Sequence, residues 1–251
     1  MRCLPSIATL PPATFFLRQH VFFCRDIHYC VILDLDHDEY YCVDRRTFDA
    51  LGPWLHGWEK AGECEARADD VSHLPADARE LAAKWLRAGL LSDHPDDIKD
   101  ARPIWLAPST DELAAGYSVP TRKSHWYNAP AFFLSCMTAS RQMKSPLGSI
   151  ITHIRARKQR KLHSARASDV ERARALVTAF DALRPWYPRP YLCLFDSLAL
   201  LNFLAWYGVF PDLVFGVTAE PFKSHCWVRI GTTVLNDTVE RTVGFTPILN
   251  I

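Results

Sequence analysis

The chain has 251 residues, of which 49% are hydrophobic and 12% aromatic, and its formal net charge is +1. This composition can bury a substantial core and excludes a disordered or low-complexity chain, while the length fits one large domain or two small ones. The charge is unevenly spread. Residues 26–80 hold 14 acidic residues against 5 Lys/Arg, whereas residues 141–174 hold 10 Lys/Arg against 2 acidic residues. We expect two regions of different character, and we expect the basic run to be a solvated helix face rather than a nucleic-acid patch.

The first residues lack the pattern of a secretion signal. Residues 1–16 carry three prolines within a short apolar stretch, which interrupt the continuous apolar segment that such a signal needs. The longest apolar run, near 129–134, is far shorter than the ~20 residues of a membrane-spanning helix. We therefore expect a cytoplasmic protein without a membrane span.

Eight cysteines are spread along the chain, and none belongs to a Cys-x-x-Cys pair. A chain of this length does not need disulfides to fold. Cys24, Cys30 and Cys42 lie in apolar runs, where a cysteine acts as a small core hydrophobe rather than as a zinc ligand. We expect free thiols, no metal site and no cofactor.

The N-terminal third has a pattern of strands followed by helices. Short β-branched or aromatic runs between polar turns predict three antiparallel strands, and helical spacing then predicts two helices. The predicted strands are His20–Cys24, Cys30–Leu35 and Tyr40–Val43, and the predicted helices are Thr47–Leu55 and Pro75–Leu90. This order is typical of a winged-helix-like module, which we place at residues 14–92.

A winged-helix-like module commonly binds DNA, but this one is net acidic, and Asp77 and Glu80 lie on the helix that would enter the groove. Peptide capture fits better, because an open strand edge can accept an added strand. The predicted peptide-binding residues are Tyr40, Tyr41, Cys42, Val43, Leu81 and Trp85. The alternative, that the residues of this edge only complete the core of the module, has equal weight.

Residues 93–130 are rich in Asp, Pro, Ser and Thr, so we expect a linker there. Residues 131–251 then form the second domain, which begins with helices. Their predicted ranges are Ala131–Gln142, Ile150–His163 and Ser168–Leu183, with Ser168 as the N-cap of the last.

A nearly unbroken apolar run begins at Cys193 and ends at Tyr207, before Gly208. A helix that is apolar on all sides must be buried at the centre of its domain. Cys193 lies at its N-terminal end, where unpaired amides and the helix dipole favour a thiolate and can stabilise an oxyanion. Cys193 is therefore a candidate nucleophile.

Three strands are predicted after this helix, over Leu213–Thr218, Cys226–Ile230 and Thr233–Leu235. His225 opens the second of them and Asp237 closes the third. A catalytic thiol needs a base that takes its proton and a carboxylate that holds the imidazole tautomer. We predict a catalytic triad of Cys193, His225 and Asp237.

Two other carboxylates could compete for the third role. Asp196 is expected to be a helix-start charge instead, and Asp212 a turn residue. Each triad member alone is a weak signal, because a lone cysteine or strand histidine usually belongs to a core. The combination of the three carries the prediction.

The hairpin before Asp237 sets a geometric condition. A two-residue connection at Gly231–Thr232 would pair Asp237 with Cys226 and turn its side chain away from His225. We therefore predict a bulge, or a three-residue connection from Gly231 to Thr233.

The spacing of these residues resembles the B proteins of lasso-peptide biosynthesis. The matching residues are Cys193, Ser224–His225–Cys226–Trp227–Val228 and Asn236–Asp237, with Phe215–Gly216–Val217–Thr218 and Pro221–Phe222 beside them. The resemblance implies an α+β chain, in which a leader-recognition module is fused to a papain-like or transglutaminase-like peptidase with a Cys-bearing helix packed on an antiparallel sheet. It also implies Cys193 as nucleophile, His225 as base and acid, and Asp237 as orienting group.

The partners that this resemblance implies are a ribosomal precursor peptide, bound by its leader, and an ATP-dependent macrolactam synthetase. Cleavage of the leader–core junction is the leading hypothesis. A triad-dependent acyl transfer to an amine, as in transglutaminases, is a second, because the pocket rather than the triad chooses the acceptor. A non-catalytic scaffold that presents the precursor is a third.

Overall fold

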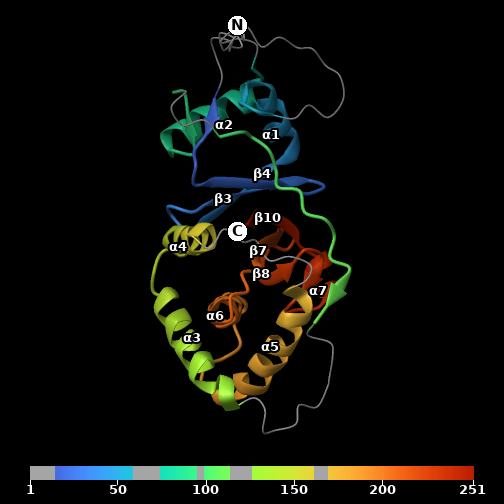
Figure 1. Ribbon diagram of the computed structural model, residues 1–251. Coiled ribbons are helices and arrows are strands. Elements are labelled where there is room, and N and C mark those ends of the chain that lie inside the picture. The colour runs from blue at the N-terminus through green and yellow to red at the C-terminus, as the bar shows by residue number, and fades with distance from the viewer. Residues whose placement is uncertain (1–14, 59–73, 95–98, 114–125, 161–168) are drawn as a thin grey trace, which may run out of the picture. The chain divides into compact units, whose positions relative to one another are not determined.

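The computed structural model describes residues 15–58, 74–94, 99–113, 126–160 and 169–251. The chain divides into two compact units. The N-terminal unit comprises Met1–Asp34 and Tyr41–Pro103, and the C-terminal unit comprises Leu35–Tyr40 and Ile104–Ile251. Both contain helices and sheets, so the chain has an α+β fold (Figure 1).

The N-terminal unit contains the three-stranded sheet that the sequence predicts. Its strand order is β2-β3-β4, so β4 is an edge strand, and β1 pairs separately with β5. The elements are β1 Phe16–Leu17, β2 Val21–Arg25, β3 Tyr29–Asp34, β4 Glu39–Asp44, α1 Arg45–Leu51, a 3-10 helix Gly52–Trp54, α2 Ala76–Arg87 and β5 Leu91–Ser92. The predicted strands agree with β2, β3 and β4 to within one residue at each end.

Side-chain and backbone capping set the ends of the two helices. The Asp44 carboxylate accepts hydrogen bonds from the amides of Arg46 and Thr47, at 2.9 and 3.1 Å, and so begins α1. Pro75 directly precedes α2, as its fixed φ favours. Gly89, at φ +71°, follows the end of α2 in the left-handed conformation that favours glycine.

The core of the N-terminal unit centres on Phe48, which is fully buried. Its ring lies 5.0 Å from that of Phe23 on β2 and 5.6 Å from that of Trp85 on α2, between ring centroids. These contacts join the sheet to both helices. Cys24 and Cys30 are buried as predicted, but Cys42 is exposed, because its side chain points away from the core-facing side of the edge strand.

The C-terminal unit is a mixed sheet covered by helices. The sheet has the order β10-β7-β8-β9-β6, in which β6 runs parallel to β9 and the other pairs are antiparallel. The elements are β6 Asp111–Glu112, a 3-10 helix Trp126–Asn128, α3 Ala129–Gln142, α4 Leu147–Arg160, α5 Asp169–Leu183, a 3-10 helix Arg184–Trp186, α6 Cys193–Trp206, β7 Asp212–Thr218, β8 Lys223–Ile230, β9 Thr233–Val234, α7 Val239–Val243 and β10 Thr246–Asn250.

Helix α6 is the central helix of this unit, as its apolar sequence predicts. It contacts β8 and lies between α3 and α5 (Figure 1). Phe195, Leu200, Phe203 and Leu204 all have an exposed fraction of zero. Packing on all sides therefore fixes the helix that begins at Cys193.

The segment predicted as a linker contributes to the C-terminal sheet. Residues 111–112 form β6 beside β9, and the Leu113 amide donates to the Val234 carbonyl at 2.8 Å. The division between units falls at Pro103, so the linker boundaries drawn at 93 and 130 differ from it. A two-residue strand is too short to show a period in the sequence, and its pairing is set by the open edge of β9.

Other differences lie near the chain's C-terminal end and at a helix start. Helix α7 and strand β10 were not predicted, and β10 tolerates Pro247 because it is an edge strand. The predicted N-cap Ser168 and the end of the predicted basic helix lie outside the described residues.

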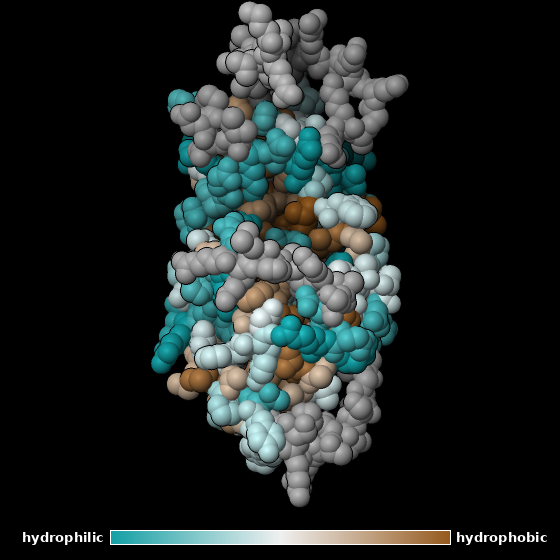
Figure 2. Space-filling view, viewed as in Figure 1, coloured by the Kyte–Doolittle hydropathy of each residue, from teal (hydrophilic) through white to brown (hydrophobic). Residues whose placement is uncertain are grey.

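The exposed face of α2 carries both signs of charge. It is hydrophilic over its visible area (Figure 2), and its exposed charged residues are Asp77, Arg79, Glu80, Lys84 and Arg87. Along the parts of the chain that the structure describes, no helix combines the length and apolar character needed to cross a membrane.

Truncation of the α6 core should destabilise the C-terminal unit. The ring of Phe203 is fully buried, with its centroid 5.7 Å from that of Phe180 and 5.2 Å from that of Tyr207. We expect Phe203→Ala to lower the free energy of unfolding by about 3–5 kcal/mol. Trp206→Ala, at a site 62% exposed on the same helix, is the control and should cost less than about 1 kcal/mol. Denaturant titration followed by circular dichroism measures both, and equal losses would contradict the packing of α6.

Candidate active site

Cys193 is the first residue of α6 and is exposed. The preceding residue, Leu192, is extended and provides no side-chain cap. The first backbone hydrogen bond of the helix runs from the Asp196 amide to the Leu192 carbonyl, so the amides of residues 193–195 have no partner within the helix. The thiol therefore lies beside free N–H groups that can bind an oxyanion.

His225 and Asp237 form a buried pair. The imidazole Nε2 contacts the Asp237 carboxylate in a short hydrogen bond, and the two residues are 8% and 9% exposed. Nδ1 is then the ring nitrogen left for the hydrogen bond between His225 and Cys193. The structure thus brings the three predicted triad residues together. His225 is the third residue of β8 rather than its first.

The hairpin that leads to Asp237 differs from the prediction. Ile230 pairs with Thr233 and Arg229 with Val234, so the connection is the two-residue turn Gly231–Thr232. The prediction of a three-residue connection or a bulge is wrong, because the pairing of β8 with β9 shows no register shift. Gly231 has φ +57°, which favours glycine at this turn. Asp237 still reaches His225 because it lies beyond the end of β9.

Just beyond β9, the side chain of Asn236 takes the place of a backbone hydrogen-bond acceptor of the sheet. The Leu235 amide donates to the Val228 carbonyl at 2.8 Å, but the Val228 amide donates to Asn236 Oδ1, also at 2.8 Å, instead of to the backbone. Asn236 Nδ2 donates to Ser197 Oγ on α6, at 2.9 Å. The chain can therefore leave the ladder without an unpaired amide, and the strict alternation of side chains ends before Asp237.

The imidazole is held between aromatic side chains. The ring centroid of His225 lies 5.1 Å from that of Phe245 and 6.0 Å from that of Trp227. Gly216 pairs with His225 across the sheet, and a Cβ added there would lie 2.9 Å from both Phe245 and Trp227. Glycine at this position leaves room for the two rings that support the histidine.

The site favours a thiolate–imidazolium pair. Hydrogen bonds from Cys226 and from His225 lower the pKa of Cys193 to about 4, although burial raises it. Burial lowers the pKa of His225, but the hydrogen bonds with Asp237 and Cys193 outweigh it and raise the pKa to about 9. For Asp237, burial raises the pKa of the carboxyl group. The hydrogen bonds that it accepts from His225 and from the Thr238 amide outweigh burial, so the net effect is a lowered pKa. Between pH about 4 and about 9, the Cys193 thiolate and the His225 imidazolium are therefore present together.

Cys226 is a residue near the site whose role the sequence did not indicate. It is 3% exposed, and its side chain and its backbone amide both interact with the Cys193 sulfur. Cys226 follows His225 directly, and side chains alternate along a strand, so it points to the face that α6 covers. The sequence does not show that Cys226 and Cys193 are neighbours, because this depends on where α6 packs against the sheet.

Asp196 does not belong to the triad. Its carboxylate forms an ion pair with the buried guanidinium of Arg184 and accepts a hydrogen bond from the Leu192 amide at 2.7 Å. Arg184 also donates to three carbonyls of the segment 187–190, at 3.1 to 3.3 Å. These contacts fix the chain just before the nucleophile. The second rival, Asp212, lies in β7 and pairs with Lys158.

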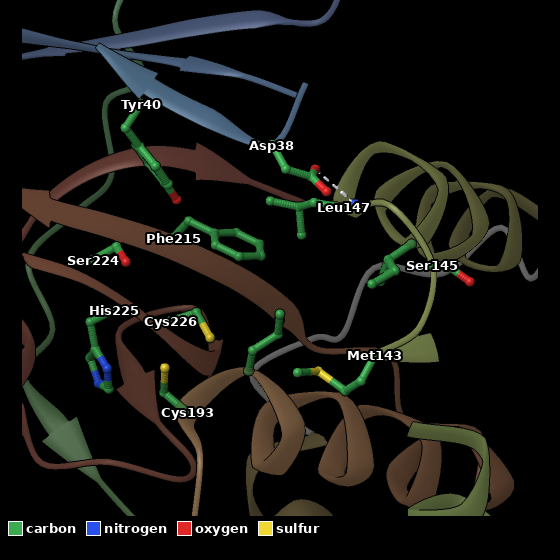
Figure 3. Close-up of a pocket in the computed structure, with 12 residues that line it drawn as sticks. Asp38, Tyr40, Met143, Ser145, Leu147, Cys193, Phe215, Ser224, His225 and Cys226 are labelled. Carbon is green, nitrogen blue, oxygen red and sulfur yellow. Dashed lines mark hydrogen bonds between the residues drawn. The ribbon is translucent and has the colours of Figure 1, made fainter. Parts of the chain in front are cut away.

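Two cavities with different linings both include Cys193, His225 and Cys226. The first is mostly apolar, and Figure 3 shows Met143, Leu147 and Phe215 around it, with Cys193 and His225 at its edge. The second has a volume of about 210 Å³ and is more polar. Its lining includes Asp181, Arg184, Tyr191, Asp237 and Arg241. An extended substrate can therefore occupy both cavities next to the nucleophile.

The predicted peptide-binding residues lie on β4 and on α2; Tyr40 belongs to the C-terminal unit and the other five to the N-terminal unit. Cys42 is exposed, while Tyr40, Tyr41 and Val43 are half-buried. Leu81 is also half-buried and packs on the core of the unit, together with Tyr41 and Val43. Trp85 is 2% exposed and belongs to that core, which leaves its ring little surface for a peptide. Peptide contact at this edge stays a prediction.

In the described ranges, no group of three or more His, Cys, Asp or Glu side chains is arranged to hold a metal ion. The groups at Cys193 that can carry chemistry include the thiol, the imidazole, the carboxylate and the amides of the helix start.

Alkylation by iodoacetamide tests the ion pair, because the thiolate is the reactive form. The rate at Cys193 should rise with pH through about 4 and stay high at neutral pH. His225→Ala removes one of the three hydrogen bonds that lower the pKa of Cys193, so the rise should move to higher pH. Peptide mass mapping separates Cys193 from the exposed Cys42, whose labelling is the internal control. A wild-type midpoint near the ordinary thiol value of about 8.5 would contradict the pair.

Comparison with known proteins agrees with this geometry. Residues 141–250, which include Cys193, His225 and Asp237, match the family model described as the transglutaminase-like superfamily. Comparisons with curated proteins and with solved structures found no match. The segment that holds the whole candidate site, less than half of the chain, is therefore similar to the transglutaminase-like superfamily.

Proposed function

We propose that this protein is a cytoplasmic cysteine peptidase that binds the leader of a ribosomally synthesised lasso-peptide precursor and cleaves the leader–core junction. The observation that carries the chemistry is that Cys193 and His225 line the same two cavities, and that Nε2 of this histidine binds the buried carboxylate of Asp237. The lasso-peptide assignment rests on the resemblance of the sequence around these residues. The similarity to the transglutaminase-like superfamily supports a cysteine-based acyl-transfer site.

The residues present can perform each step of hydrolysis. The Cys193 thiolate attacks the carbonyl carbon, and the amides at the start of α6 stabilise the oxyanion. The His225 imidazolium donates its proton to the leaving amine and then acts as a base toward water, which hydrolyses the thioester. Asp237 holds the ring orientation throughout. The product peptide then bears a free amine for an ATP-dependent macrolactam synthetase.

Leader binding is assigned to the N-terminal unit. Among the described strands the sheet order ends at β4, and the proposed mode of leader binding is the addition of an extended peptide at this end of the sheet. Exposed Cys42 and half-buried Tyr41 and Val43 lie along this edge, and Leu81 lies on the neighbouring helix α2. The mixed charge of α2 gives no electrostatic basis for duplex binding.

Removal of the thiol should abolish cleavage. We expect no leader release by Cys193→Ala, and a loss of roughly 10²–10⁴-fold for His225→Ala. The substrate is a synthetic peptide with the sequence of a short precursor-like reading frame beside the gene, and mass spectrometry follows the products. Cys136→Ala, at a buried cysteine on α3, is the control for thiol loss.

The same mass measurement separates the possible activities. Leader and core masses that add up to the substrate plus one water support hydrolysis. An amine adduct on the acyl fragment would instead make the protein an acyltransferase, and full maturation with His225→Ala would make it a scaffold.

Peptide pairing along β4 should slow amide exchange in that strand. We expect added precursor peptide to protect the amides of residues 39–44 from hydrogen–deuterium exchange, because a bound strand slows the opening of the strand it pairs with. The amides of α3 serve as the internal control and should not change. Protection confined to the C-terminal unit would place leader binding elsewhere.

A further inference from the structure

A second thiol lies beside the nucleophile, and beyond the hydrogen bonds that lower the pKa of Cys193 it carries no step of the proposed hydrolysis. Figure 3 shows the sulfur atoms of Cys193, at the start of α6, and Cys226, on β8, pointing toward one another. Cys226 Sγ also lies 3.9 Å from Ser197 Oγ, one turn along α6. Proton transfer in the proposed reaction needs only His225, and a hydrogen bond to the thiolate does not by itself require a second sulfur at this position.

The two thiols differ in access and in charge. Both cysteines line the two cavities, but Cys193 is exposed whereas Cys226 is only 3% exposed. Exposed thiolates are the forms that peroxides oxidise, and a neighbouring thiol can trap the product as a disulfide. Cys193 lies on α6 and Cys226 on β8, and these two elements pack directly on one another. The two sulfurs therefore stay close together.

We infer that Cys193 and Cys226 are an oxidation site, which forms an intramolecular disulfide when a peroxide reaches the active site and thereby protects the nucleophile in a reversible form. The inference uses the geometry of the proposed active site but does not require that its substrate be a lasso-peptide precursor.

The chemistry balances with hydrogen peroxide as the oxidant. The Cys193 thiolate attacks one peroxide oxygen, the O–O bond breaks, and a sulfenic acid forms while the hydroxide that leaves takes a proton to become water. The Cys226 sulfur then attacks the sulfenic sulfur, the S–O bond breaks, and the S–S bond forms. The second water carries away the sulfenic oxygen and the Cys226 proton. Two thiols lose two electrons, and one peroxide becomes two waters.

The charge of Cys193 controls when Cys226 can react. The hydrogen bond with Cys193 raises the pKa of the Cys226 thiol most, and burial raises it further, to well above its ordinary value. A sulfenic acid at Cys193 is neutral, so its formation removes the main charge that keeps Cys226 protonated. Cys226 should therefore be inert beside the thiolate and become reactive only after Cys193 is oxidised.

Peroxide treatment of the full chain tests the pair. Wild-type protein should lose two hydrogen atoms in mass, yield a proteolytic peptide that links residues 193 and 226, and lose iodoacetamide labelling at Cys193 until dithiothreitol restores it. Cys226→Ala should instead accumulate sulfenic acid that dimedone traps, and then sulfinic acid, with labelling permanently lost. Cys136→Ala, at a buried cysteine of α3, should behave as the wild type.

The readouts are masses and labelling, so they do not depend on peptidase activity. Cys226→Ser, checked for folding by circular dichroism, replaces Cys226→Ala if that variant does not fold. Absence of the linked peptide from oxidised wild type would overturn the inference. Equal recovery of Cys193 labelling in wild type and in the Cys226 variant would overturn it as well.

Discussion

The side chain of Asn236 links the segment that carries Asp237 to strand β8 and to helix α6. It accepts a hydrogen bond from the Val228 amide, which would otherwise pair with the backbone of the hairpin. It also donates a hydrogen bond to Ser197 on α6. Leaving such a buried amide unpaired would cost about 1–3 kcal/mol. Because Asn236 removes this cost, the chain can leave the sheet one residue before Asp237. The carboxylate is then free to reach His225.

A second constraint acts at the other end of the triad. The buried guanidinium of Arg184 binds Asp196 and three carbonyls of the segment before α6, and Asp196 holds the Leu192 amide. A buried cation needs such partners, since an unpaired one would be strongly destabilising. The same contacts fix the backbone that leads into Cys193. Helix start and hairpin are thus set independently, and the packing of α6 on β8 joins them.

Much of the fold followed from local pattern. The strands β2, β3 and β4 were visible as β-branched and aromatic runs, and α6 as an apolar segment with its nucleophile first. The weakest predictions concerned short elements. Strand β6 has two residues and acquires its partner from the edge of β9, so its own sequence carries no period. Trp85 was assigned to a peptide surface, but its ring fills the core, because helical spacing alone does not show what covers a face.

The sequence by itself determined the residue types and the spacing of Cys193, His225 and Asp237, and the apolar helix that places the thiol at the start of a buried helix. Tertiary structure decided how Asp237 meets His225, since the two-residue turn that the sequence argument rejected is present and Asn236 compensates for it. It also decided that Cys226 lies under the nucleophile. Alternation along a strand fixes which face a side chain takes, but only the packing of α6 on that face brings the two sulfurs together.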